Sequence, residues 1–478
     1  MKHKRARHKC HATSVSLVRE SGPVSGRQRW RWAGRWLPEF RHPSQVVVAG
    51  FAAVIAIGTV LLYLPVAKAG PGGATVLEAL FTATSAVCVT GLIVVDTGSY
   101  WSGFGELVIT ALIQVGGFGF MTMATLLVML VTRRIGLRSR LSVATETKAL
   151  GLGDVRSVVL GVAKITILFE MILATILVAR LAGSYGHTLG EAIRLGGFHS
   201  ISAFNNAGFS LHQDNLIRYN QDPWILLPVA VGFICGGLGF PVLLELRRQF
   251  RRAQRWSLHT KLTVTVTAIL LVAGFAFVLA SEWRNPATLA NMSIPDRLLN
   301  AFFNSATTRT AGFNSLEVGD MTAGTWLGMV VLMFIGGGSA STAGGIKVTT
   351  FALLFFVIVA EIRGERSVTV FDRRVGPRVQ RQALTIALLG VAGIVVATLV
   401  LTELTDHSLD RLLFEAASAF GTVGLSTGIT ADLPAAGEVI LVMLMFFGRL
   451  GPITLASALA IRERGRLYEL PEGRPIIG

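Results

Sequence analysis

The sequence predicts an all-α polytopic membrane protein in which four pseudo-symmetric repeats surround a central pore. Of the 478 residues, 52% are apolar and only 15% are charged, with a mean hydropathy of +0.59, which is too apolar for a soluble domain. Eight apolar stretches are each long enough to cross about 30 Å of hydrocarbon. A short segment recurs four times, once within each pair of stretches. Each repeat is therefore expected to contain two transmembrane helices with a re-entrant pore segment between them.

The apolar stretches determine the expected organisation of the chain. They lie near residues 45–66, 105–131, 158–182, 224–246, 260–280, 326–360, 382–404 and 438–461. The segment before them lacks the short apolar core of a cleavable signal, so we expect a cytoplasmic extension there. The expected parts are a basic N-terminal extension (1–43), repeats 1 to 4 (44–140, 141–255, 256–366 and 367–465) and a C-terminal tail (466–478).

The basic residues indicate the orientation of the chain in the membrane. Eleven Lys and Arg lie in residues 1–43, six in each of the connections 132–157, 245–261 and 361–381, and four after Ile461. Lys and Arg near helix ends favour the cytoplasmic side. Both termini and the repeat-to-repeat connections are therefore expected to be cytoplasmic, with the recurring segments open to the outside. Topology and contact with anionic membrane lipids explain most of the net charge of +16, so no nucleic-acid partner is expected.

The recurring segments align without a gap and share two landmarks. They read SAVCVTGLI (85–93), SAFNNAGFS (202–210), ATTRTAGFN (306–314) and SAFGTVGLS (418–426). Each has a glycine at its seventh position and a phenylalanine ten residues before that glycine. The predicted ion selectivity filter consists of the glycine and the two residues before it in each copy, namely Val89, Thr90, Gly91, Asn206, Ala207, Gly208, Thr310, Ala311, Gly312, Thr422, Val423 and Gly424.

The chemistry of these segments favours a cation pore. About ten helix-like residues precede each glycine motif, and their length of roughly 15 Å cannot cross the membrane. Non-helical backbone at membrane depth is tolerated where it is buried in protein or lines a wet path. Glycine can take positive φ, so successive carbonyls can face one side and form rings that replace the water shell of a monovalent cation. The alternative, glycines that only permit close helix packing, explains four copies with shared offsets less well.

A short glycine-rich segment, called here the glycine step, recurs 24 to 28 residues after each filter glycine. Its third and fourth copies are unusual. In the first two copies (116–120 and 236–240) we expect a bend or a close helix crossing. The apolar stretch 326–360 would be about 52 Å long as one helix, so we expect an intramembrane loop that gates the pore. A simple kink is the alternative, and the Lys-Ser/Thr sequence of a phosphate-binding loop is missing. The predicted gate residues are Gly336, Gly337, Gly338, Ser339, Ala340, Ser341, Thr342, Ala343, Gly344, Gly345, Lys347 and Arg449.

Arg449 replaces a glycine in the fourth copy of the step. A guanidinium at bilayer depth is costly unless it faces a wet cavity or a partner. Pseudo-fourfold symmetry places it below the filter, where its charge would oppose cations, and a buried ion pair between helices is the alternative. For Arg309, inside the third pore segment, we expect structural bracing of the filter.

Four linked helix–pore–helix units with single-glycine filters resemble the Trk/Ktr/HKT superfamily of potassium transporters. The resemblance covers about residues 44–478, and the eight spans and the ending YELPEGRPIIG are most similar to the Ktr-type membrane subunit. It implies K⁺ as the transported ion at four glycine filters, with loop 336–347 and Arg449 matching the family's gate loop and pore arginine. It also implies a plasma (inner) membrane homodimer on a separately encoded cytosolic ring of nucleotide-binding regulatory subunits, with no organic cofactor on this chain.

Two other classes of function are less well supported by the sequence. A sodium-coupled or sodium-selective carrier of cations or solutes would usually show inverted repeats with paired broken helices, whereas these four units run in the same direction. An enzyme would require a cluster of catalytic side chains. The nine histidines are scattered, and no His/Asp/Glu group recurs at membrane depth.

Overall fold

The computed structural model describes residues 43–134, 155–371 and 373–451 of the chain. All that follows concerns the described residues of the unit His42–Gly478. The predicted N-terminal extension, most of the connection 132–157 and the C-terminal tail lie outside the described residues.

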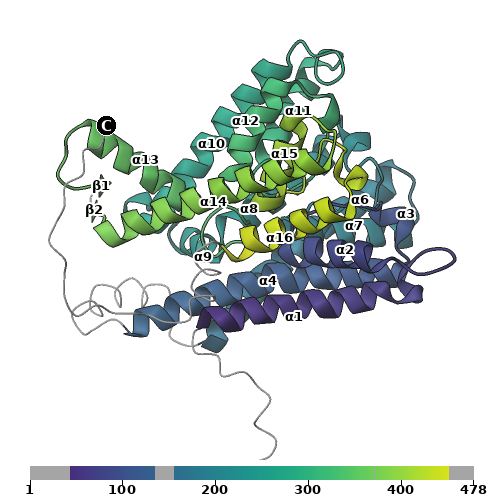
Figure 1. Ribbon diagram of the computed structural model, residues 1–478, viewed down its shortest axis with the longest axis horizontal. Helices are drawn as coiled ribbons and strands as arrows, with labels where there is room; N and C mark the ends of the chain where they lie inside the picture. The colour runs from purple at the N-terminus through teal and green to yellow at the C-terminus, as the bar shows by residue number, and fades with distance from the viewer. Residues whose placement is uncertain (1–42, 135–154, 372, 452–478) are drawn as a thin grey trace, which may run out of the picture. The chain divides into compact units, whose positions relative to one another are not determined.

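Each repeat consists of a long helix, a short pore helix and a second helix (Figure 1). In repeat 1 these are α1 (Pro43–Tyr63), α2 (Val76–Cys88) and α4 (Gly103–Arg134), with the short α3 (Thr97–Tyr100) before α4. Repeat 2 comprises α6 (Val155–Ser184), α7 (Leu189–Phe204), α8 (Pro223–Leu238) and α9 (Phe240–Gln249). Repeat 3 comprises α10 (Leu258–Glu282), α11 (Ile294–Thr307), α12 (Ala323–Phe334) and α13 (Val348–Ile362). Repeat 4 comprises α14 (Pro377–Leu404), α15 (Leu409–Gly421) and α16 (Ala435–Leu450). The connection before α14 forms a small antiparallel pair of strands, β1 (Thr369–Val370) and β2 (Arg373–Arg374).

The first helix of each repeat has the length and hydropathy of a membrane span. These apolar spans are Gln45–Tyr63, Val159–Ser184, Leu258–Glu282 and Pro377–Leu404, and only 28–33% of each is buried inside the protein. α8 and α9 together also have the length and hydropathy of a span, but they are bent by 102°. Most of the surface of the first helices is therefore not covered by other parts of the described protein.

The pore helices begin at polar caps and form the buried centre. The Thr75 hydroxyl accepts a hydrogen bond from the Glu78 amide, and the Glu78 carboxylate accepts one from the Thr75 amide, which makes a complete capping box. Ser293 caps α11, and Ser408 stands at the N-cap of α15. The phenylalanine ten residues before each filter glycine is fully buried in repeats 1 and 4.

The four repeats close into a circle through one recurring contact. The second helix of each repeat packs against the pore helix of the next, as α4 against α7, α8 against α11, α12 against α15 and α16 against α2. Figure 1 shows the last of these pairs, in which the C-terminal α16 lies beside α2 of the first repeat. The predicted pseudo-fourfold arrangement is thus present in the described part of the chain.

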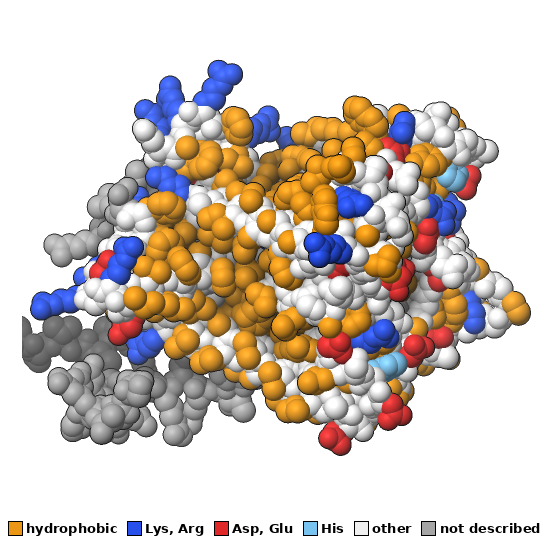
Figure 2. All heavy atoms as spheres, turned by 90° about the horizontal axis from the view of Figure 1, so that it is seen from above, with side chains coloured by type: hydrophobic (Ala, Val, Ile, Leu, Met, Phe, Trp, Pro, Cys, Tyr) orange, Lys and Arg blue, Asp and Glu red, His pale blue; other side chains and the backbone are white. Residues whose placement is uncertain are grey.

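Acidic side chains gather toward one end of this helical unit, whereas Lys and Arg are present at both ends. Figure 2 shows Lys and Arg crowded at the end that carries β1 and β2, and most of the visible Asp and Glu gathered at the opposite end. The basic end includes the connections 245–261 and 361–381, whereas Asp96, Asp214 and Glu317 surround a cavity outside the filter. The orientation of these ends in the membrane stays a prediction.

Candidate ion pore

The chain leaves each pore helix through a turn in which two residues are left-handed. The filter glycines Gly91, Gly208, Gly312 and Gly424 have φ of 91°, 69°, 75° and 93°. The residues two places earlier, Val89, Asn206, Thr310 and Thr422, have φ of 57°, 59°, 75° and 49°. The four segments therefore share one backbone conformation. The glycine conformation is predicted from sequence. The positive φ two residues earlier is not predicted, because three of those four residues are β-branched and such residues rarely take positive φ. Only their fixed offset from the glycine marks these positions.

The four glycines lie next to one another in a closed ring. A Cβ placed on Gly91 would lie 2.4 Å from the carbonyl oxygen of Ala207 and 3.0 Å from Cα of Gly208. The same construction on Gly208, Gly312 and Gly424 brings the Cβ to 2.8, 2.3 and 2.1 Å from the carbonyl oxygens of Ala311, Val423 and Thr90. Each glycine thus faces the carbonyl just before the next glycine, and the fourth faces the first. No side chain fits at these positions, so the predicted filter residues of all four repeats come together around one axis.

Serines on the pore helices hold the backbone of the filter. Six residues before the filter glycine, Ser85 and Ser418 accept hydrogen bonds from the amides of Gly91 and Gly424 over 3.0 and 3.1 Å. The equivalent Ser202 donates instead to the carbonyl oxygen one residue beyond the filter glycine, over 2.8 Å. These bonds fix the strand to its own pore helix at the ring, so the carbonyl positions are set by a rigid element.

A buried carboxylate braces the chain just outside the fourth filter glycine. Glu415, on α15, is fully buried and accepts hydrogen bonds from the Ser426 hydroxyl (2.7 Å), the Thr427 amide (2.9 Å) and the Thr430 hydroxyl (2.8 Å). All three groups donate their hydrogen bonds to Glu415. This arrangement suits an ionised carboxylate, which can only accept hydrogen bonds. Sequence reasoning missed this residue, although an acidic side chain in an apolar pore helix is a signal that could have identified it.

Two other repeats contain a counterpart of this brace. In repeat 2, His199 contacts the Ser210 hydroxyl over 2.9 Å, at the same offsets from the filter glycine as Glu415 and Ser426. In repeat 3, the Asn304 amide donates to the Ser315 hydroxyl over 3.1 Å. The braces differ in chemistry, so the quarters of the filter are alike in backbone but distinct in their supports.

Outside the ring of glycines lies a cavity of about 440 Å³. Its lining includes the filter glycines Gly91, Gly208 and Gly424 and the carboxylates Asp96, Asp214 and Glu317. Burial raises the pKa of Glu317, and the nearby Asp320 adds to that effect. The cavity leads directly to the filter and carries acidic groups, which favours the approach of cations over anions.

The glycine-rich loop (336–347) lies against the inner side of the filter. The Thr342 hydroxyl donates to the Asn206 side chain over 2.9 Å. A Cβ on Gly344 would lie 1.9 Å from Oγ1 of Thr422. A Cβ on Gly336 would lie 3.4 Å from Thr310. The loop thus contacts or approaches the left-handed residue of three repeats. It interrupts the stretch 326–360 between α12 and α13, as the sequence predicts.

The glycine-rich loop is held in this position by hydrogen bonds to the break between α8 and α9. The Gly338 amide donates to the Gly237 carbonyl over 2.8 Å, and the Thr342 amide to the Gly236 carbonyl over 3.3 Å. Within the loop, the Lys347 ammonium donates to the carbonyl oxygen of Ala343 over 2.5 Å. Loop and helix break are therefore one hydrogen-bonded unit beneath the filter.

Arg449 connects this loop to the first repeat across the pore. Its guanidinium donates to the carbonyl oxygen of Thr342 and, over 2.9 Å, to the carbonyl oxygen of Gly116 on α4. The side chain is 1% exposed. The Arg449 side chain thus bridges repeats 1 and 3 through two backbone carbonyl oxygens, and its role as a barrier below the filter stays a prediction.

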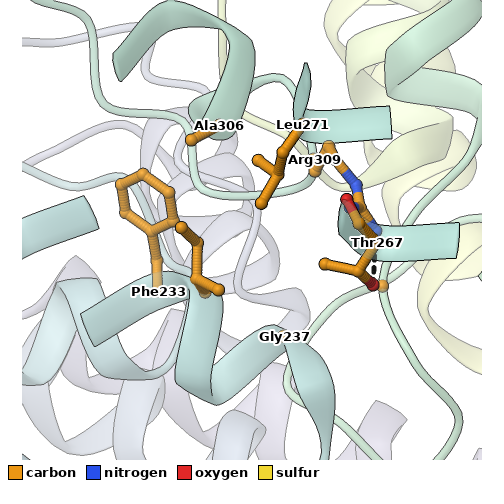
Figure 3. Close-up of a pocket in the computed structure, with 8 residues that line it drawn as sticks. Phe233, Gly237, Thr267, Leu271, Ala306 and Arg309 are labelled. Atoms are coloured by element: carbon orange, nitrogen blue, oxygen red, sulfur yellow. Dashed lines mark hydrogen bonds between the residues drawn. The ribbon is translucent and has the colours of Figure 1, made fainter. Parts of the chain in front are cut away.

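Arg309 braces the start of the same loop (Figure 3). It donates to the carbonyl oxygen of Thr267 on α10 over 3.1 Å. It also donates to the carbonyl oxygen of Gly336 over 3.3 Å. Figure 3 shows the small cavity beside it, of about 20 Å³, which is lined mainly by apolar side chains such as Phe233 and Leu271. The contacts of Arg309 are thus with α10 and the glycine-rich loop, and the expected bracing of the filter by Arg309 stays a prediction.

The glycine steps allow close packing beneath the pore helices. A Cβ on Gly116, Gly236 or Gly448 would lie 2.1, 1.9 or 1.8 Å from the carbonyl oxygen of Val87, Phe204 or Phe420, each four residues before a filter glycine. α4 passes its step without a break, whereas α8 ends at the second step and α9 continues at 102°. The first copy is thus a close crossing and the second a crossing with a bend, the two forms that the sequence leaves open.

Comparison with known proteins identifies the family. Residues 24–469 match the model of the TrkH family, described as cation transport proteins. The chain belongs to this family. The Ktr system potassium uptake protein B of Bacillus subtilis is 42% identical over 440 residues, 91% of this chain and 97% of that protein. The protein of the same name from Vibrio alginolyticus is 38% identical, over 91% of this chain and 94% of that protein.

Two further comparisons bear on the fold and on the ion. The structure resembles that of the potassium transporter TrkH from Vibrio parahaemolyticus with a TM-score of 0.70 at 19% identity, over 89% of this chain and 86% of that one. The Potassium/sodium uptake protein NtpJ of Enterococcus hirae is 34% identical, over 91% of this chain and 97% of that protein. The predicted fold class and superfamily are confirmed, and membership of a cation transport family confirms that the chain is a transporter rather than an enzyme.

Proposed function

We propose that this chain mediates potassium uptake across the plasma membrane through a filter formed by its four glycine segments. The closed ring, in which each glycine faces the carbonyl before the next, is the observation that carries the proposal. Rings of backbone carbonyls replace the hydration shell of K⁺ in other filters. The printed names of the relatives from Bacillus subtilis and Vibrio alginolyticus support K⁺ as the ion.

In this proposal the glycine-rich loop and Arg449 form the gate. A cation leaving the filter inward meets the loop, which contacts filter residues of repeats 2 and 4 through Thr342 and Gly344. The Arg449 charge beneath adds a Coulomb barrier of several kcal/mol where the local dielectric is low. Displacement of the loop breaks its bonds to Gly236, Gly237 and Arg449 together, so the gate opens as a unit.

The assembly proposed for this chain is a homodimer with cytoplasmic termini, bound to a separate ring of nucleotide-binding regulatory subunits. The likeness to Ktr system proteins supports a separate regulatory partner. The basic end of the helical unit provides a surface of suitable charge for the cytoplasmic face (Figure 2). Crosslinking of the purified chain, with and without such a partner, would measure both associations.

Rubidium uptake into liposomes containing the purified protein tests the transport proposal. Uptake that is competed by potassium and only weakly by sodium is expected. A sodium-selective or sodium-coupled carrier is the second candidate, favoured by the name of the Enterococcus hirae relative. It requires that excess sodium competes equally with rubidium or that uptake is absent without sodium. Either result would replace the potassium-pore proposal.

A further inference from the structure

A basic, amphipathic surface adjoins the helix break that holds the glycine-rich loop. α8 has 16 residues, about 24 Å of helix, so it ends near the inner side of the membrane. At Gly239, with φ of 92°, the chain bends by 102° into α9. In the orientation of the proposed function, on which this inference rests, α9 therefore runs nearly parallel to the cytoplasmic membrane surface.

The two faces of α9 and the residues after it differ in chemistry. The apolar residues Phe240, Leu243 and Leu244 pack in a cluster with Phe204, the last residue of pore helix α7. Phe250 is 74% exposed. The exposed basic side chains of this segment are Arg247, Arg248, Arg251, Arg252 and Arg255. A basic face beside an exposed aromatic ring is typical of helices that lie in the headgroup region.

The same segment is tied to the proposed gate at its start and to α10 at its end. The Phe240 amide donates to the Ala340 carbonyl of the glycine-rich loop over 3.3 Å. Further along α9, the buried Glu245 accepts hydrogen bonds from the amide and hydroxyl of Ser257, at 2.6 and 2.7 Å. A force that holds α9 in the membrane plane therefore acts on the residues that bind the loop.

We propose that residues 247–255 bind the anionic headgroups of the inner leaflet and that this binding stabilises the docked, non-conducting position of the glycine-rich loop. A ligand shifts a conformational equilibrium only if it binds one state better. The headgroups contact α9 while it lies in the plane with its start bonded to Ala340. Release of the loop frees the break at Gly239 and lets the arginines leave the surface. Anionic lipid therefore lowers basal flux.

The first test measures lipid retention by the purified full-length chain in native mass spectrometry with phosphatidylglycerol. Each basic residue near an anionic surface contributes about fivefold in affinity, so loss of three should weaken retention on the order of 100-fold. The test variant carries Arg247→Gln, Arg251→Gln and Arg252→Gln. The matched control carries Arg366→Gln, Arg378→Gln and Arg381→Gln. It removes three other exposed positive charges, one in the connection before α14 and two in the first turns of α14. Equal retention by the two triple variants would overturn the lipid site.

The second test measures rubidium uptake in phosphatidylcholine vesicles with and without phosphatidylglycerol, in the absence of any other protein. Wild type and control should lose flux when phosphatidylglycerol is added, and the test variant should not. An equal response of all three proteins would overturn the coupling to the loop. If rubidium uptake by the test variant differs from wild type only when a nucleotide-binding protein is added, the arginines bind that partner instead of lipid. A wild type that conducts in no vesicle contradicts the transport proposal, while the retention measurement still decides the lipid site.

Discussion

The Arg449 guanidinium donates a hydrogen bond to the carbonyl oxygen of Thr342, and so joins the last described helix of repeat 4 to the glycine-rich loop of repeat 3. The Thr342 hydroxyl in turn donates to Asn206, a predicted filter residue of repeat 2. One residue of the loop thus contacts both the filter above and the arginine beside it. A change at either partner is expected to alter the position of the loop.

Substitution of a filter glycine by serine should reduce selectivity for potassium over sodium. In Gly91→Ser or Gly312→Ser the new Cβ would lie 2.4 or 2.3 Å from a neighbouring filter carbonyl, at positive φ. Backbone strain of about 1–3 kcal/mol would move the carbonyls, so selectivity should fall about tenfold or more. Competition of rubidium uptake by sodium measures the change. Gly186→Ser is the matched control, because Gly186 also has positive φ but no atom within 4 Å of an added Cβ. Unchanged selectivity at all four glycines would contradict the filter assignment.

Shortening the glycine-rich loop between Gly337 and Gly344 should raise flux and weaken dependence on a cytosolic regulator. Each lost hydrogen bond of the docked loop contributes about 0.5–1.5 kcal/mol, so loss of two should increase the open population about tenfold. Selectivity should persist because the filter is untouched. With each loop shortened by the same number of residues, up to four, a deletion within the exposed outer loop 70–73 serves as the control. A folded, shortened protein no faster than wild type in liposomes would refute the gate.

Arg449→Ala should increase cation flux or alter its gating, and Arg449→Lys should retain much of the barrier. The substitution removes a buried charge together with the bonds to Thr342 and Gly116. Melting temperature and single-liposome flux are measured on the same preparations. If alanine lowers the melting temperature while flux per folded molecule stays normal, Arg449 only joins helices.

Glu415→Ala should lower both thermal stability and selectivity. The substitution leaves donors from Ser426, Thr427 and Thr430 buried without this acceptor, at a cost of about 1–3 kcal/mol. The outer end of the fourth filter strand would then shift. Glu415→Gln keeps one acceptor oxygen and should be intermediate, and Glu403→Ala, at an exposed position, should change neither property. Normal selectivity in a destabilised Glu415→Ala protein would limit the residue to a stabilising role.

Acidification of the outer side should destabilise the loop around His212, which lies outside the membrane-spanning segments. Burial, together with the nearby His199 and Arg218, lowers the pKa of His212 from 6.5 to about 3. The neutral ring is therefore favoured, and Tyr219 contacts it over 3.1 Å. The neutral His212 ring contributes fully to the free energy of unfolding above about pH 6.5. This contribution is lost as the pH falls toward 3, because the unfolded chain then binds a proton that the folded protein disfavours. Melting curves across this range should show a smaller loss for His212→Gln, and identical curves would exclude His212 as the cause.

The repeats could be predicted from the sequence because their signals are local and recur. Four copies of a glycine at fixed offsets identify the filter, and the length of 326–360 requires a break. These features do not depend on which elements meet in space. The same reasoning gives the fold class, since apolar length and charge placement are read along the chain.

The contacts between repeats could not be read in this way. The sequence does not indicate that Arg449 reaches Gly116, more than three hundred residues earlier, or that Thr342 reaches Asn206. Glu415 was missed because its three partners follow it along the chain in a loop whose path depends on the filter turn. The left-handed conformation of Val89 and Thr422 runs against their intrinsic preference and is imposed by tertiary packing.

The ring of four glycines is assembled from a single polypeptide. In a pore made of four identical chains, one codon change alters every quarter at once, and most such changes are too drastic to keep. Here one codon change alters one quarter, and the other three retain their geometry. Natural variation can therefore adjust ion preference in small, independent increments, and each quarter can acquire a separate history of substitution.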